Sequence, residues 1–156
     1  MTDFSHLDED GAVHMVDVGS KEPSQRTAVA VARVAMAAAT RDALIGGSLP
    51  KGDALATVRI AAIQGAKRTS DLIPLCHPLA LDGVDVSVDP IDDGVQIRVT
   101  ARIHARTGVE MEAMTGAAVG ALALYDMIKG VDRSAAVNGV MLIHKSGGTS
   151  GEWNRE

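Results

Sequence analysis

The strongest constraint on the fold of this chain is a strict alternation of apolar and polar side chains, interrupted once by a turn. From Leu81 to Asp89 three valines alternate with Asp and Ser, and from Val95 to Arg106 apolar residues again occupy every second position. Between these stretches lies Asp92-Asp93-Gly94, which is typical of a tight hairpin turn. The pattern predicts two antiparallel strands with one face covered and the other nearer to solvent.

Three apolar segments rich in small residues predict the helices that cover this hairpin. Ser24 to Ile45 is Ala-rich, begins after Pro23 and ends at Gly46-Gly47, so we expect one long helix there. A second helix is expected from Asp53, a favourable N-cap residue, to about Ser70. A third is expected from about Val109 to Gly130.

Short alternating stretches at His14–Val18 and Val137–His144 predict two further strands. The expected order is then strand, helix, helix, hairpin, helix, strand. That order predicts an α+β fold, ferredoxin-like in character, with helices packed on one face of a mainly antiparallel sheet. The 156 residues suffice for a single domain with its own core. We expect flexible polar tails at residues 1–12 and 146–156.

The composition excludes several classes of function. The net charge is −5 at pH 7 and aromatic residues make up only 2% of the chain. The chain therefore lacks the basic balance and the stacking surfaces of a nucleic-acid-binding domain. No stretch is long and apolar enough to span a bilayer, and the acidic N-terminal residues do not resemble a signal peptide. The single cysteine fits a reducing compartment, so we expect a cytoplasmic protein with neither a nucleic-acid nor a membrane partner.

A corner bracketed by prolines is the first candidate for a functional site. Pro74 and Pro78 enclose Cys76 and His77. Each proline fixes its own φ and keeps the preceding residue out of the helical region. The corner is therefore stiff and holds His77 at a defined angle, as a binding or catalytic site requires. A structural zinc site is not expected, because the chain has no second cysteine and its other histidines lack ligand spacing.

The third predicted helix carries charged residues at both ends. At its start, Glu110 and Glu112 flank Met111, and their carboxylates share a side if this stretch is extended but diverge by about half a turn if it is helical. Acidic residues there also stabilise the helix dipole without any further role. Near its end, Asp126 and Lys129 share a helix face. They form either an ordinary surface ion pair or a partly buried site with a lysine of lowered pKa.

Three more basic residues carry weak signals of their own. Lys51 lies in a Pro-Lys-Gly-Asp loop, and Lys67 lies at the end of the second predicted helix, where the dipole favours cations. Lys145 precedes a stretch rich in Gly and Ser that suits an anion. It is not a phosphate-binding loop, because the lysine precedes the glycines and no helix follows.

Together these segments closely resemble the cyclic pyranopterin monophosphate synthase family of molybdenum cofactor biosynthesis. The matching segments lie between residues 14 and 148: His14-Met15-Val16-Asp17-Val18, Lys51-Gly52-Asp53, Ala66 to Thr69, Asp71 to Leu79, Thr107 to Ala113, Tyr125-Asp126-Met127 with Lys129, and Lys145 to Gly148. The runs Leu-Cys-His-Pro-Leu and Glu-Met-Glu-Ala are the most specific. The departures are minor: Ser70 stands where some relatives have tryptophan, and Met114-Thr115-Gly116 varies the usual helix sequence.

The resemblance implies a reaction and an assembly. The implied substrate is 3′,8-cyclo-7,8-dihydroguanosine 5′-triphosphate, and the implied products are cyclic pyranopterin monophosphate and pyrophosphate, as for a phosphorus–oxygen lyase. The family is ferredoxin-like and forms a homohexamer, a trimer of dimers, with active sites at subunit interfaces. The resemblance gives no certain cofactor and leaves open whether magnesium accompanies the triphosphate.

That chemistry assigns expected roles to the candidate residues. Ring opening and reclosure require proton transfers, and expulsion of pyrophosphate requires nearby positive charge. Catalytic roles are expected for Lys51, Asp126 and Lys129, with Asp126 orienting Lys129 or moving a proton itself. Substrate binding is expected for Lys67, Cys76, His77, Glu110, Met111, Glu112 and Lys145. We expect Cys76 to contribute packing rather than to act as a nucleophile.

Two other functions use the same residues differently. A metal-dependent enzyme would use His77, Glu110 and Glu112 as ligands and would be sensitive to chelators. A noncatalytic oligomer would bind nucleotides or other phosphorylated ligands through the same lysines and would gain nothing from Asp126. Turnover of the cyclic dihydro-GTP would exclude this second alternative.

Overall fold

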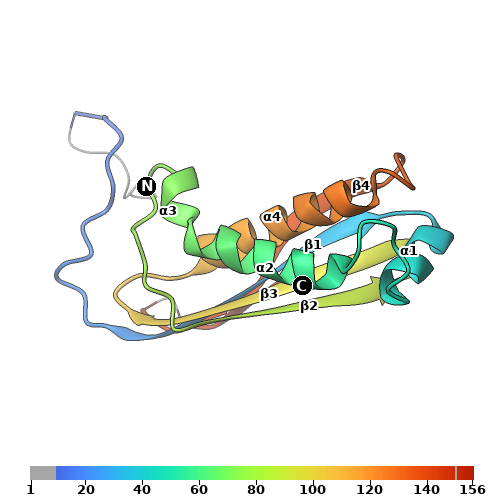
Figure 1. Ribbon diagram of the computed structural model, residues 1–156. Helices are drawn as coiled ribbons and strands as arrows, with labels where there is room; N and C mark the ends of the chain where they lie inside the picture. Colours follow the sequence, from blue (N-terminus) through green and yellow to red (C-terminus); the bar gives the residue numbers. More distant parts are fainter. Residues whose placement is uncertain (1–9, 150) are drawn as a thin grey trace.

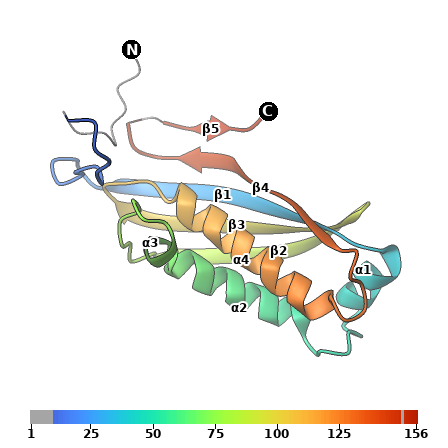
Figure 2. The ribbon, with the colours of Figure 1, turned by 90° about the horizontal axis from the view of Figure 1, so that it is seen from above.

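The computed structural model, which describes residues 10–149 and 151–156, has an α+β fold in which two long helices cover one face of a five-stranded sheet (Figures 1 and 2). The fold class is therefore confirmed. The elements in chain order are β1 (Ser24–Ala35), α1 (Ala38–Ile45), α2 (Ala54–Lys67), α3 (Thr69–Leu72), β2 (Gly83–Ile91), β3 (Gly94–Ala105), α4 (Glu110–Ile128), β4 (Ala136–Ser146) and β5 (Trp153–Asn154).

All neighbouring strands of the sheet run antiparallel, in the order β2-β3-β1-β4-β5. The first four strands have the ferredoxin-like arrangement. The predicted hairpin is confirmed, since β2 and β3 pair from Gly83 opposite Arg102 to Ile91 opposite Gly94. The last strand, β4, is also confirmed. In the C-terminal part that we expected to be flexible, β5 pairs with the end of β4, and of the expected N-terminal tail residues 1–9 lie outside the described residues.

The predicted helix from Ser24 to Ile45 is wrong over its first half. That half is β1, the strand between β3 and β4, and only Ala38–Ile45 is helical. Every second residue of β1 from Ala28 to Val34 is fully buried, which is the period of a strand. Alanine favours helices, but pairing on both edges and burial against α4 override that preference. The small side chains also let the helix lie close to the sheet.

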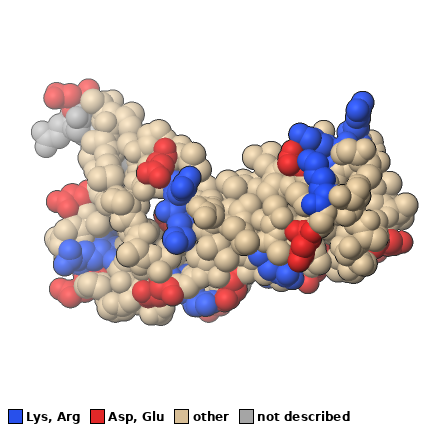
Figure 3. All heavy atoms as spheres, viewed as in Figure 1, with Lys and Arg blue, Asp and Glu red and all other residues tan. Residues whose placement is uncertain are grey.

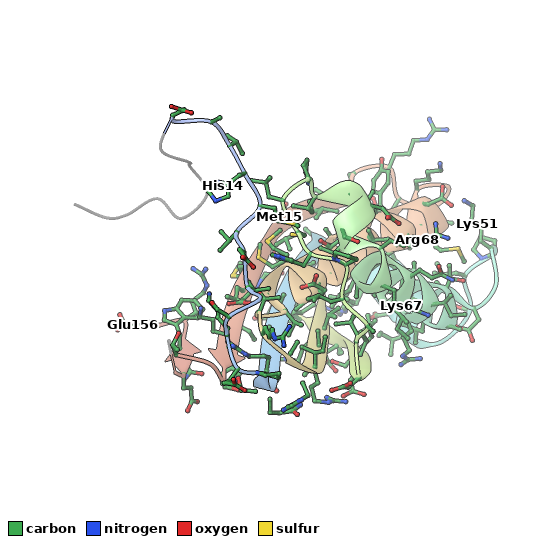
Figure 4. The ribbon with its side chains drawn as sticks, turned by 90° about the vertical axis from the view of Figure 1, so that its left-hand side faces the viewer. His14, Met15, Lys51, Lys67, Arg68 and Glu156 are labelled. Atoms are coloured by element: carbon green, nitrogen blue, oxygen red, sulfur yellow. The ribbon has the colours of Figure 1, made fainter. Side chains whose placement is uncertain are left out.

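The predicted strand at His14–Val18 is also wrong. Only an isolated bridge at Val13 is present, and residues 14–18 form no regular element. Figure 4 shows His14 and Met15 on the N-terminal segment, apart from Lys51, Lys67 and Arg68. The alternation there instead points Val16 and Val18 toward a cavity.

Small residues bring the two long helices close together and onto the sheet. A Cβ atom at Gly65 of α2 would overlap the side chain of Val119 on α4, and one at Gly116 would approach the carbonyl oxygen of Ala62 to 2.9 Å. The underside of α4 is fully buried through Ala113, Ala117, Ala121, Leu124 and Ile128. Such tight packing resists displacement, so α4 is a rigid bar that fixes the positions of the groups at its two ends.

Candidate functional site

A cavity of about 550 Å³ lies at the N-terminal end of α4. It is bounded by the first turn of α4, the proline-bracketed corner, the segment before β1 and the end of β4. Its lining residues are Val16, Val18, Lys21, Leu75, Cys76, His77, Leu79, Thr107, Gly108, Glu110, Met111, Glu112 and Lys145. The fold thus brings together six of the predicted substrate-binding residues, from three separate parts of the chain.

Glu110 and Glu112 both line this cavity although both lie in the helix. Side chains two positions apart on a helix point about 200° away from each other. The cavity wraps around the end of α4 and therefore meets both side chains. Glu112 is only 4% exposed. Burial, and to a lesser extent the neighbouring charge of Glu110, raise the pKa of Glu112 from its ordinary value of 4.5 to about 7. Glu112 therefore exchanges a proton near neutral pH.

Glu110 pairs with a lysine from the far edge of the cavity. The Nζ atom of Lys145 donates to Oε1 of Glu110 over 3.0 Å. The side chains of Lys145 and Glu110 are 30% and 31% exposed. The Glu110 carboxylate folds back over Gly108, where a Cβ atom would overlap it. A side chain at position 108 would therefore displace the Glu110 carboxylate from this place.

The corner places Cys76 and His77 at the cavity wall. Burial first, and then the nearby Glu112, raise the pKa of the Cys76 thiol. A thiol with a raised pKa is a poor nucleophile at neutral pH, which supports the expected packing role for Cys76.

A second charged group lies at the other end of α4 and joins the three predicted catalytic residues. Lys51 Nζ donates to the backbone oxygen of Asp126 over 2.6 Å and lies 3.2 Å from its Oδ2, while Lys129 Nζ lies 2.7 Å from Oδ1. These three side chains, here called the Lys–Asp–Lys cluster, are all substantially exposed. Hydrogen bonds from Lys129 and then from Lys51 lower the pKa of Asp126, which keeps it a carboxylate.

Of the two alternatives for Asp126 and Lys129, the single chain shows the exposed ion pair and not a lowered pKa of Lys129. Its hydrogen bond to Asp126 raises the pKa instead, because the side chain is half exposed and its partner is an anion. The helix separates this cluster from the cavity by about 24 Å between Glu110 and Asp126, at 1.5 Å per residue. Figure 3 accordingly shows charged side chains at both ends of this face, with a largely uncharged stretch between them.

A family model for the MoaC family matches residues 15–148, which includes both ends of α4. The chain belongs to the MoaC family. It is 52% identical over 152 residues to the cyclic pyranopterin monophosphate synthase of Streptomyces coelicolor, covering 97% of this chain and 89% of the relative. It is 52% identical over 153 residues to cyclic pyranopterin monophosphate synthase 2 of Mycobacterium bovis, covering 98% and 92%. The Brucella ovis synthase is 50% identical over 152 residues, covering 96% and 92%.

This MoaC chain has basic residues at the cavity that sequence analysis missed. Lys21 lines the cavity, and Arg26 lines a narrow 20 Å³ extension beside Lys145. The Nε atom of Arg26 is buried and has no hydrogen-bond partner among the described residues. Neither residue stands in a telling pattern, and Arg26 fell within the wrongly predicted helix. Lys67, which was predicted, lines a separate cavity of about 320 Å³ that shares only Leu79 with the first.

The metal-enzyme alternative would need several ligand side chains grouped around one point among the described residues. Among these residues, no group of three or more His, Cys, Asp or Glu side chains is placed to hold a metal ion, and this includes His77, Glu110 and Glu112.

Within the part of the chain that the structure describes, no helix is both long and apolar enough to cross a membrane.

Proposed function

We propose that this protein converts 3′,8-cyclo-7,8-dihydroguanosine 5′-triphosphate to cyclic pyranopterin monophosphate and pyrophosphate, as a lyase of molybdenum cofactor biosynthesis. Relatives named cyclic pyranopterin monophosphate synthase align with nearly the whole chain, which supports this reaction. The observation that carries the mechanism is that one helix holds a cavity with a proton-exchanging carboxyl at one end and the Lys–Asp–Lys cluster at the other.

The cavity end binds the substrate. Its volume of about 550 Å³ suits a nucleotide-sized ligand. His77 and Glu110 hold the ring derived from guanine, while Cys76 and Met111 form the walls. Lys145 meets phosphate oxygens, exchanging its contact with Glu110 for one with the substrate, and Lys67 adds positive charge from its neighbouring cavity.

Glu112 moves a proton during the rearrangement of the ring. Opening and reclosing the purine requires protons to leave and return, and a carboxyl with a pKa of about 7 both gives and takes them near neutral pH. A fully exposed glutamate would remain ionised and could only accept. Burial of this side chain therefore selects it for proton transfer among the groups of the cavity.

The Lys–Asp–Lys cluster acts on the phosphate step. A substrate hydroxyl forms a bond to the α-phosphorus and loses its proton, while the bond to the pyrophosphate oxygen breaks. Lys51 and Lys129 stabilise the negative charge that develops on the leaving group and exchange protons with the reacting oxygens. Asp126 stays ionised and holds both ammonium groups in place.

The two ends meet across a subunit contact. One substrate does not reach across about 24 Å of helix, so the cluster of one copy must complete the cavity of another. The outer faces of the helices carry Ile60 and Leu122 with 61% and 63% exposure, which favours burial against a partner. We propose a homohexamer built as a trimer of dimers, located in the cytoplasm. A magnesium ion bound to the triphosphate would enter as part of the substrate.

The test is turnover by the purified protein, read as oxidation of the product to a fluorescent pterin and as release of pyrophosphate. We expect both signals from the unmodified protein and a loss of both by at least about a hundredfold in a folded Lys129→Ala variant. Binding of the substrate without turnover would favour the noncatalytic alternative. Loss of turnover after chelation, restored by a transition metal, would favour the metal enzyme.

A further inference from the structure

Asp132 lies in the turn that follows α4 and is only 7% exposed. Its carboxylate accepts four hydrogen bonds. Oδ1 accepts from the backbone N–H and the hydroxyl of Ser134, over 3.0 and 2.6 Å. Oδ2 accepts from the backbone N–H of Ala37 over 2.8 Å and from the Thr40 hydroxyl over 3.2 Å. Both oxygens of a buried carboxylate are therefore satisfied.

The bonds from Ala37 and Thr40 come from the start of α1. The N-cap residue of α1, Ala37, makes no side-chain cap hydrogen bond. Asp132, 95 positions further along the chain, instead accepts from the backbone N–H of Ala37 itself and from the Thr40 hydroxyl in the first turn. Asp132 is itself tied to the end of α4, since its backbone N–H donates to the carbonyl oxygen of Ile128 over 2.9 Å. One side chain thus joins the C-terminal end of α4 to the N-terminal end of α1.

From α1 the chain leads directly to Lys51 through a tethered loop. Leu44, at the end of α1, is buried, and the backbone N–H of Ser48 donates to the carbonyl oxygen of Ala43 over 2.9 Å. Leu49 is also buried in the core. On the far side, the Asp53 side chain accepts from the backbone N–H of Ala56 and starts α2. The loop therefore has little freedom of its own, and the placement of α1 at one end and of α2 at the other determines where Lys51 lies.

The Lys–Asp–Lys cluster is built across this joint. Asp126 and Lys129 belong to the α4 side, whereas Lys51 belongs to the α1 side and crosses to Asp126 over 2.6 and 3.2 Å. The cluster is exposed and has no packing to hold these distances. The packing of α2 on α4 fixes one end of the loop that carries Lys51. The buried polar contact that fixes the other end, by joining α1 to the end of α4, is the one made by Asp132.

We propose that Asp132 is a positioning residue for the reaction, acting through Lys51 by fixing α1 against the end of α4. This inference rests on the proposed function, and Asp132 touches no substrate. A displacement of Lys51 by about 1 Å is sufficient to slow a reaction step severely without weakening substrate binding.

Asp132→Asn and Asp132→Ala test the proposal. The asparagine keeps one oxygen acceptor and the alanine keeps none, so the proposal expects kcat to fall about tenfold in the first and further in the second, with KM within about twofold of the unmodified protein. Ile97→Val, a core truncation beneath the middle of α4, is the control for a general loss of stability. Equal losses of kcat in Ile97→Val and Asp132→Asn at equal loss of Tm would overturn the proposal.

Two further measurements separate this inference from the proposed function. If Asp132 acts through Lys51, then Asp132→Asn lowers kcat less than about twofold in a Lys51→Ala background; a full tenfold loss there would overturn the inference. The second measurement is the rate at which Lys51 reacts with an amine-modifying reagent, followed by peptide mass spectrometry. This measurement does not depend on enzymatic turnover. The rate should rise in Asp132→Asn and stay unchanged in Ile97→Val. A protein without turnover would sink the proposed function, whereas an unchanged rate for Lys51 would sink the inference.

Discussion

The two ends of α4 carry similar residue types but treat their charges in opposite ways. At the start of the helix, burial makes the Glu112 carboxyl exchange its proton near pH 7. At the end of the helix, hydrogen bonds from Lys129 and Lys51 lower the pKa of Asp126 and keep it ionised. The same carboxylate raises the pKa of Lys129. One end offers a buried carboxyl that exchanges a proton, and the other presents two ammonium groups held in place by Asp126. The difference arises from burial at one end and from hydrogen bonds between a carboxylate and two lysines at the other.

Removal of the fixed charge should have the largest effect. Lys129→Ala and Asp126→Ala are expected to lower kcat by roughly 10² to 10⁴-fold, because one removes a charge at the leaving group and the other releases both ammonium groups. Stability should change little, since the side chains are exposed. Single-turnover rates check this. The exposed Arg133→Ala is the control in the same turn, and near-full turnover by either cluster variant contradicts the assigned roles.

Replacement of the buried acid should remove a pH effect at the other end. In Glu112→Gln, the limb of the kcat/KM profile near pH 7 should disappear, together with at least about a tenfold loss of rate. An unchanged limb in the variant would show that another group is responsible.

The same substitution should also change how the stability of the fold depends on pH. The unfolded chain ionises Glu112 near its ordinary pKa of 4.5 and the folded chain only at about 7, so the native protein loses stability as pH rises between these values. Glu112→Gln escapes this loss. The free energy of unfolding of the variant, relative to that of the unmodified protein, should rise from pH 5 to pH 8 by up to roughly 3 kcal/mol. Urea unfolding at each pH measures this difference. A difference independent of pH would contradict the buried ionisation.

Loss of the cavity lysine should affect binding more than chemistry. Lys145→Met is expected to raise KM by about ten- to a hundredfold, the size of one hydrogen bond to a charged group, with a smaller change in kcat. The salt dependence of KM should weaken in the variant, because one charge contact to phosphate is lost. A fall in kcat at unchanged KM would instead place Lys145 in the chemical step.

Lys67 should give the smallest effect, because it lies in the neighbouring cavity and adds charge at a distance. Lys67→Met is expected to raise KM by only about two- to fivefold at low salt and to approach the unmodified protein at high salt. A loss as large as that of Lys145→Met would indicate that the two cavities join when the assembly or the substrate is present.

The alternating hairpin and the long third helix were predictable because their periodicity and their turn or cap residues agree. The strand β1 was not, because its core positions are mostly alanines whose burial depends on α4, which begins 75 residues after the strand ends. For the site, the proline-bracketed corner and the Glu-Met-Glu run identified the cavity. Arg26 and Lys21 escaped notice because only the tertiary fold brings them there. The raised pKa of Glu112 likewise depends on burial that no local pattern expresses.

We propose that each active site takes its cavity from one copy of the chain and its Lys–Asp–Lys cluster from another. The most direct test mixes His77→Ala with Lys129→Ala by co-expression with two affinity tags, and compares turnover of the mixed assembly with that of each variant alone. Random mixing leaves about one site in four with both an intact cavity and an intact Lys–Asp–Lys cluster. We therefore expect recovery of roughly a quarter of the unmodified activity. Activity no greater than that of the separate variants, in assemblies proven to contain both, would contradict it.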